Sequence, residues 1–358
     1  MDPISAQSVL AAAGAGGTVP FDGYLAVAHN VPSPPGIKTY PFTTASGFGT
    51  AFSGPSSNAT SDGRDVAFHP DATYLAHVAN QSPYVWVYNW SSSGFGSLVS
   101  NPSSFPNTGP NKVTFAPDGN AIAVSNNFSP YIEAWSWSSG WGSKYSNPSS
   151  LPQTHCHAVA WTPDGDYIAV ATQAFSEPFC IYPWSNSSGF GTKLSNPSYS
   201  GNTRGANAVD FHPDGTFFAL GERYNGDVSR STVHVWAWSS GFGTKQSAPS
   251  SYPQGPVNAV KFSPNGEYIA VASNVSPDIH VWPWSSSGFG SPYANPSTLP
   301  GYDQYDCAWT TDSAALVSCG LVSPFVHAWA FDNGFGSKYS NPSTLPQTSG
   351  RGVDLVMA

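Results

Sequence analysis

The sequence predicts an all-β fold built from repeated four-stranded sheets, and three observations support this. The chain has 358 residues, of which 35 are Gly and 33 are Pro, and both are poor residues for the interior of a helix. Aromatic residues make up 14% of the chain and charged residues only 9%, which excludes a disordered protein. Finally, a Gly–aromatic–Gly triplet recurs at intervals of 46 to 52 residues, with its aromatic residue at Phe48, Phe95, Trp141, Phe190, Phe242, Phe289 and Phe335.

Each repeat divides into four strand-sized pieces, and the sixth copy shows them in order. The first strand, at 260–262, ends at Asn265-Gly266, a strong hairpin signal because Gly takes the positive φ that the turn needs. The second strand, at 268–272, ends at a Ser-Pro pair, and the third, at 279–284, is a Trp-x-Trp segment. The fourth runs from the Gly-Phe-Gly at 288–290 towards Asn-Pro, and Pro suits an edge strand. Seven such units predict a seven-bladed β-propeller of four-stranded antiparallel blades.

The two ends of the chain predict how the ring closes. The first copy begins at Asp22-Gly23 and has no proper first strand, whereas the last seven residues, 352–358, have the pattern of that missing strand. We therefore expect the C-terminal strand to return and complete blade one, which removes the free sheet edges that favour aggregation. The predicted organisation is a tail at 1–18 and a propeller at 19–358.

Aromatic residues recur at fixed places on the first and third strands. On the third strands a second aromatic follows two residues after the first, so both rings lie on one face of the strand. Such a stripe is compatible with sugar binding, but its recurrence in every copy favours packing between blades. The third-strand pairs are Tyr88 and Trp90, Trp135 and Trp137, Tyr182 and Trp184, Trp236 and Trp238, Trp282 and Trp284, and Trp329 and Phe331.

The order Val-x-Phe-x-Pro-Asp-Gly, Ile-Ala-Val-Ala, Val-x-Val-Trp resembles the WD40-type propeller repeat, over residues from about 19 to the end. The sequence differs from the WD40 repeat pattern at two positions. The Gly-His pair before the first strand is absent, and the third strand ends in Trp-x-Trp rather than Trp-Asp. The resemblance implies that the connection before each first strand and the loop between the second and third strands share one face of the ring.

Charge and motifs exclude several functional classes. The formal net charge is −9 and there is no basic run, so we expect no nucleic-acid partner. No apolar run is long enough for a membrane span, and the first residues lack the pattern of a secretory signal. The four Cys are expected to be buried thiols, although a disulfide between Cys307 and Cys319 is an alternative. His155 and His157 are spaced for a metal, but no third ligand is evident nearby, so we predict no metal and no cofactor.

Polar residues that differ between repeats indicate where binding occurs, because variable loops on a rigid scaffold usually hold the binding site. They lie in the connections before first strands and in one long insertion at 222–230, in blade five. Solvated loop charges are the alternative interpretation. The Pro-Asp-Gly carboxylates of Asp118, Asp164 and Asp214 are expected to be turn residues. The candidate binding residues are Arg64, Lys112, His155, His157, Arg204, Arg223, Arg230, Asp303, Asp306 and Arg351.

The N-terminal tail suggests a function. Its Ala- and Gly-rich sequence, with Ile4, Val9 and Leu10 as apolar anchor residues, cannot form a core alone and is expected to dock on a partner. Together with the low-charge Ser- and Asn-rich repeats, it resembles bacteriophage virion proteins of the capsid, neck or tail. We therefore expect a non-enzymatic virion component whose tail binds other virion proteins and whose propeller contacts a host-surface glycan or receptor. A carbohydrate-binding propeller and a cytoplasmic WD40-type scaffold are the alternatives.

Overall fold

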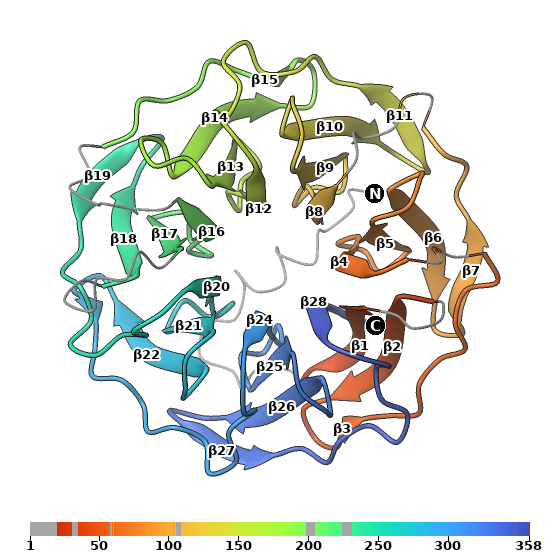
Figure 1. Ribbon diagram of the computed structural model, residues 1–358, viewed down its shortest axis with the longest axis vertical. Helices are drawn as coiled ribbons and strands as arrows, with labels where there is room; N and C mark the ends of the chain where they lie inside the picture. The colour runs from red at the N-terminus through yellow and green to blue at the C-terminus, as the bar shows by residue number, and fades with distance from the viewer. Residues whose placement is uncertain are drawn as a thin grey trace.

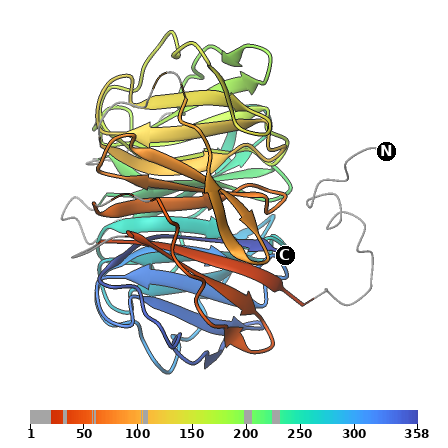
Figure 2. The same ribbon diagram turned by 90° about the vertical axis from the view of Figure 1, so that its right-hand side faces the viewer.

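Seven four-stranded antiparallel sheets form a closed ring, so the predicted seven-bladed propeller is confirmed (Figure 1). The computed structural model describes residues 20–30, 35–57, 59, 61–102, 104, 109–197, 205–223 and 231–358. Figure 2 shows the same ring from the side, with the strands running across the thickness of a disc. The tail at 1–18 with its anchor residues Ile4, Val9 and Leu10 lies outside the described residues, and so do Arg204 and Arg230.

The inner two strands of each blade, numbered here from the centre of the ring, are regular. The first strands, innermost, are β28 (Gly350–Met357), β4 (Gly63–Phe68), β8 (Pro110–Phe115), β12 (Cys156–Trp161), β16 (Ala206–Phe211), β20 (Val257–Phe262) and β24 (Gln304–Trp309). The second strands are β1 (Asp22–His29), β5 (Tyr74–Ala79), β9 (Ala121–Asn126), β13 (Tyr167–Thr172), β17 (Phe217–Glu222), β21 (Tyr268–Ser273) and β25 (Ala315–Gly320). Blades one to seven follow this order.

The outer two strands contain the Trp-x-Trp pairs and the Gly–aromatic–Gly triplets. The third strands are β2 (Ile37–Thr43), β6 (Val85–Ser91), β10 (Ile132–Trp137), β14 (Phe179–Ser185), β18 (Val233–Trp238), β22 (Ile279–Ser285) and β26 (Val326–Phe331). The fourth strands are β3 (Gly47–Phe48), β7 (Gly94–Leu98), β11 (Trp141–Lys144), β15 (Gly189–Phe190), β19 (Phe242–Lys245), β23 (Gly288–Phe289) and β27 (Phe335–Lys338). The fourth strands are short because each is an edge that soon reaches an Asn-Pro, Ala-Pro or Gly-Pro segment.

The ring closes through the C-terminal strand, as the sequence predicts. β28 pairs antiparallel with β1 from Gly23 opposite Met357 to Ala28 opposite Gly352, in a sheet of order β28-β1-β2-β3. The Ala358 amide also donates to the Asp22 carbonyl at 3.0 Å. The strand begins two residues earlier than predicted, at Gly350.

The core lies between adjacent blades. One cluster of buried residues, for example, combines blade three with blade four and contains Ile132, Trp161 and Tyr182. The ring of Trp282, at a relative exposure of 0%, is fully buried, like those of Trp135 and Trp329 at 1% and 0%. The recurrent aromatics therefore pack blade on blade, as expected, and rings of neighbouring blades meet edge to face.

The predicted turn and thiol assignments are also confirmed. Asp118, Asp164 and Asp214 each accept a hydrogen bond from the backbone amide two residues further on, inside the Pro-Asp-Gly turns. All four Cys are free and buried. Across the described ranges, we find no helix with the length and apolar character that a membrane crossing requires.

Candidate functional site

A β-bulge interrupts the first strand of every blade at the same place. In each blade the pairing with the second strand skips the second residue of the first strand. Bulges of this kind redirect a side chain and occur next to active sites. All seven side chains are half-buried, and each belongs to the innermost strand of its blade (Figure 1). We call them the bulge ring; from blade one to blade seven they are Arg351, Arg64, Asn111, His157, Asn207, Asn258 and Tyr305.

Three members of the bulge ring hold neighbouring blades together. The Nδ2 atoms of Asn111, Asn207 and Asn258 each donate to the first carbonyl of the next first strand, at 2.8, 3.2 and 2.7 Å. Asn111 Nδ2 also donates to Asn127 Oδ1 at 2.7 Å. Asn at this position therefore has a structural role. The four blades with another residue there have no Asn side chain to form this hydrogen bond, so their side chains are candidates for a different role.

Three of the four exceptions, Tyr305, Arg351 and Arg64, come from consecutive blades. The Arg351 guanidinium carbon lies 4.3 Å from the centre of the Tyr305 ring, and its Nε donates to Asn30 Oδ1 at 3.2 Å. Arg64 donates from Nη2 and Nε to the Asn80 amide oxygen at 2.7 and 3.0 Å, in the amide orientation that satisfies both groups. Burial and the nearby charge of Arg351 lower the pKa of Arg64. The two guanidiniums therefore lie close enough to repel each other.

The partner amides are themselves fixed by the backbone. Asn30 and Asn80 each follow the second strand of their blade, and their N–H groups donate to the residue before the first strand, Ser349 O at 3.1 Å and Asp62 O at 3.3 Å. The same backbone bond occurs in all seven blades. It brings the connection before each first strand onto the same face as the loop between the second and third strands, as the WD40 resemblance implies.

The fourth exception, His157, lies in blade four. Burial, followed by the charge of Arg223, lowers the pKa of His157 to about 4, so its imidazole is neutral at pH 7. Within the described part of the chain, His157 Nε2 is buried and has no hydrogen-bond partner. His155, two residues earlier, is exposed. A neutral imidazole with an unfilled nitrogen can accept a proton, and a guanidinium whose charge acts on the same place can stabilise a developing negative charge.

A buried ion cluster lies one residue beyond the bulge ring along the first strands. Lys112 Nζ of blade three lies 2.9 Å from Asp65 Oδ1 of blade two and 2.5 Å from Asp306 Oδ2 of blade seven. The side chains of Asp65 and Asp306 are only 5% and 6% exposed. Burial alone would lower the pKa of Lys112, but the carboxylates of Asp306 and Asp65 raise it, so the ammonium stays charged. Burial raises the pKa of Asp65 to about 6, against the opposing effect of Lys112.

A third carboxylate, that of the half-buried Asp354 in β28, gives a prediction about pH. Its Oδ2 accepts from the Phe68 amide at 2.7 Å, and burial raises its pKa from 3.8 to about 7. The folded protein thus holds a proton that the unfolded chain releases, so this stability is lost as the pH rises through 7. We expect Asp354→Asn, which keeps an acceptor for Phe68, to raise the melting temperature by about 2–5 °C at pH 8 and not at pH 4. Equal melting temperatures at pH 8 in a calorimetric scan would contradict this.

The structure brings together only some of the predicted site residues. Arg64, His157 and Arg351 lie in the bulge ring, and the charge of Arg223 acts on His157. Lys112 and Asp306 belong to the buried ion cluster, whereas Asp303 is half-exposed and its carbonyl accepts from the Leu321 amide at 2.9 Å. The prediction missed the remaining contributors, although aligning the second residue of each first strand would have found Tyr305 as an exception to Asn. The missed residues are Asn30, Asp65, Asn80 and Tyr305.

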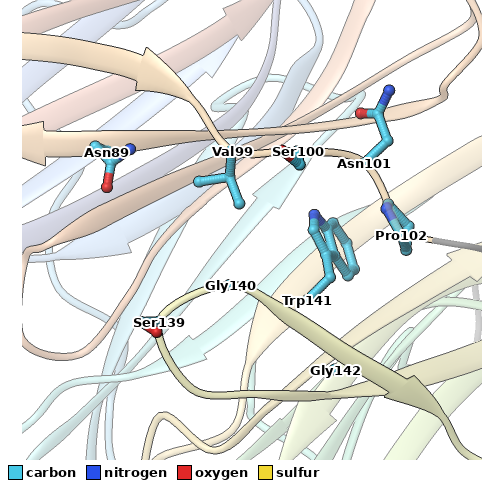
Figure 3. A pocket seen from close by; sticks show the side chains of 9 residues that line it. All are labelled: Asn89, Val99, Ser100, Asn101, Pro102, Ser139, Gly140, Trp141 and Gly142. Atoms are coloured by element: carbon cyan, nitrogen blue, oxygen red, sulfur yellow. The ribbon is translucent and has the colours of Figure 1, made fainter.

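A separate hollow of about 510 Å³ lies between blades two and three, away from the bulge ring (Figure 3). In Figure 3 the indole of Trp141 lies next to Pro102, and the Asn101 amide points away from it. No lining residue is charged, so this hollow offers no acid or base. Its residues are Asn89, Val99, Ser100, Asn101, Pro102, Ser139, Gly140, Trp141 and Gly142.

Comparisons with known proteins agree with this architecture, and the chain is a WD40-like seven-bladed propeller. The WD40 family (WD domain, G-beta repeat) matches residues 248–282, and no curated protein matches the sequence. A candidate 6-phosphogluconolactonase from Bacteroides uniformis has a similar structure, with a TM-score of 0.71 and 16% identity over 94% of this chain and 99% of that one. A candidate 6-phosphogluconolactonase from Bacteroides fragilis has a TM-score of 0.69 and 16% identity, over 94% of this chain and 98% of that one. The periplasmic gluconolactonase of Pseudomonas aeruginosa has a TM-score of 0.65 and 18% identity, over 94% of this chain and 99% of that one.

These neighbours correct the functional expectation. We expected a non-enzymatic bacteriophage component and no enzyme, whereas these structurally similar proteins are named as enzymes. The expectation of a non-enzymatic protein is therefore wrong, and no comparison supports a virion protein or a virion location. The error came from composition: Ala, Gly, Ser and Asn content describes the surface and tail of a protein but not the side chains at one position of its innermost strands.

Proposed function

We propose that this protein is a hydrolase that opens a sugar lactone at the bulge ring. The observation that carries the proposal is the neutral imidazole of His157, with its unfilled Nε2, close enough to Arg223 for that positive charge to lower the pKa of the imidazole. The names of the structurally similar proteins supply the substrate class, a lactone of a sugar acid. The fold also supports a reaction at the bulge ring, because the side chains at this position differ between otherwise equivalent blades.

A lactone is a cyclic ester, and its hydrolysis needs a base and a cation. Water adds to the carbonyl carbon and gives up a proton, the ring C–O bond breaks, and the ring oxygen takes a proton, leaving an open hydroxy acid. His157 would accept the proton from water through Nε2 and return it to the leaving oxygen. The guanidinium of Arg223 would stabilise the oxyanion that forms on the carbonyl oxygen. The rate of hydrolysis should be proportional to the fraction of His157 that is neutral, so it should fall as the pH drops through about 4.

The test is hydrolysis of glucono-δ-lactone at constant pH, corrected for the spontaneous reaction. We expect the wild-type protein to exceed the spontaneous rate, and His157→Asn to lose about 100-fold or more of that excess. Asn suits the site sterically, because it occupies the same position in blades three, five and six. The matched control is His280→Asn, on β22 and stacked on Trp282, which should keep full activity. No hydrolysis above the spontaneous rate, or equal rates for wild type and His157→Asn, would reject the proposal.

A further inference from the structure

Two guanidiniums from neighbouring blades, those of Arg64 and Arg351, lie at the same end of the ring, and neither belongs to an ion pair between described residues. Ion pairs within the described ranges use Lys or His as the cation. Asp62, close to Arg64 along the chain, raises the pKa of that guanidinium and so opposes the lowering by burial and by Arg351. The chain has a net charge of −9 and only five Arg, yet two of these Arg lie on neighbouring first strands.

The hydrogen-bond partners of Arg64 and Arg351 orient both guanidiniums but use only some of their N–H groups. A guanidinium has five N–H groups in a planar fork. Among the described contacts, Arg351 uses its Nε–H on Asn30, and Arg64 uses Nε and Nη2 on Asn80. Both acceptors are neutral amides, so they fix the position of each fork without cancelling its charge. The remaining N–H groups match the oxygens of a phosphate or a carboxylate, which Arg binds in a bidentate manner.

Like charges held close together in a half-buried place cost free energy unless an anion lies between them. Arg351 is also fixed from the side by the ring of Tyr305, 4.3 Å from its guanidinium carbon. Both arginines are bulge residues on β28 and β4, which are neighbouring first strands, so the backbone aims them at the same region. This geometry is preorganised for binding an anion rather than for stabilising the fold.

We propose that Arg64 and Arg351, with Tyr305 beside them, form a binding site for an oxyanion group, a phosphate or a carboxylate, on a small ligand. The site itself stands on the geometry of the three side chains. The identity of the rest of the ligand rests on the proposed function: the substrate would be a sugar lactone that bears an anionic substituent. The pair would thereby select charged lactones over neutral ones.

The experiment measures binding of inorganic phosphate and of acetate to the full chain by calorimetry, at constant ionic strength in chloride. We expect saturable binding of at least one anion, with a Kd in the millimolar range or below. Arg64→Gln and Arg351→Gln should each weaken it about 10-fold or more, and the double variant should abolish it. Lys245→Gln, which removes one positive charge from the exposed outer strand β19, is the control and should bind like wild type.

Two further readouts keep the result interpretable. If a Gln variant unfolds, Arg64→Lys and Arg351→Lys keep the charge but lose the fork, and they should still bind more weakly than wild type. Binding of neither anion by wild type, or an unchanged Kd in the double variant, overturns the inference. Anion binding without lactone hydrolysis rejects only the proposed function. Hydrolysis without any anion binding rejects only this site, and the tighter of the two anions identifies the substituent.

Discussion

Replacing Lys112 by Met is expected to be the most destabilising single substitution in this protein. It removes the cation from a buried cluster and leaves the carboxylates of Asp65 and Asp306 unpaired at 5% and 6% exposure. Breaking a buried ion pair in this way costs about 3–5 kcal/mol. We expect the melting temperature at pH 7.5 to fall by about 4–7 °C, measured by differential scanning calorimetry.

The position of the cluster in the ring explains why the effect is large. Lys112 belongs to blade three, Asp65 to blade two and Asp306 to blade seven, and Asp306 Oδ2 also accepts from the Val353 amide of blade one at 3.2 Å. Asp65 Oδ2 in turn accepts from the Val113 amide at 3.0 Å. The cluster around this ammonium therefore connects four consecutive blades across the place where the ring closes.

Two controls separate the charge from the loss of a long side chain. Lys112→Met combined with Asp65→Asn and Asp306→Asn removes all three charges and keeps acceptors for both amides, so it should recover much of the stability. The loss in the single variant should also shrink below pH 6, because burial raises the pKa of Asp65 to about 6 and its carboxyl then takes up a proton. A triple variant as unstable as Lys112→Met, with no dependence on pH, would show that packing of the side chain matters and its charge does not.

The fold was predictable from the sequence because each blade repeats the same physical solution. Turns with Asn265-Gly266 and its equivalents, and aromatic pairs such as Trp282 and Trp284, recur at a constant spacing, so each copy supports the assignment of the others. Even the closing strand was visible, since the pattern at 352–358 had no other place in the ring. Periodicity thus locates every blade and the interfaces between them.

The candidate site was only partly predictable, because it consists of deviations from the repeat. Arg64, Arg351 and His157 attracted notice as rare charged or ionisable residues, but Tyr305 and Asn30 are ordinary residue types in this sequence. Their role depends on a β-bulge and on a ring closure that bring the first and last blades side by side. Arg64 and Arg351 are 287 positions apart in the chain, and no local pattern indicates that their charges act on each other.

Removing residues 352–358 is expected to abolish cooperative folding of the whole ring. These residues form most of β28, and without them β1 becomes an open edge whose Leu25, Ala26 and Val27 side chains are at 0% exposure in the closed ring. An exposed apolar edge of this kind pairs with other chains and promotes aggregation. The blades on either side also lose the contacts that β28 makes with β4 and β24. Calorimetry should show a broad transition with little heat in place of one sharp peak, and light scattering should rise.

A circular permutant distinguishes loss of closure from loss of sequence. Residues 350–358 are placed ahead of residue 20 through a short flexible Gly/Ser linker, and the chain ends at residue 349. The hydrogen bond from the Ala358 amide to the Asp22 carbonyl shows that the two joined ends are neighbours. The permutant should therefore rebuild the sheet of order β28-β1-β2-β3 and melt in one cooperative step close to the wild-type temperature. If the truncated chain melts as sharply as wild type, closure by β28 is not what holds the ring together; if the permutant fails as well, the order of synthesis and not the pairing is decisive.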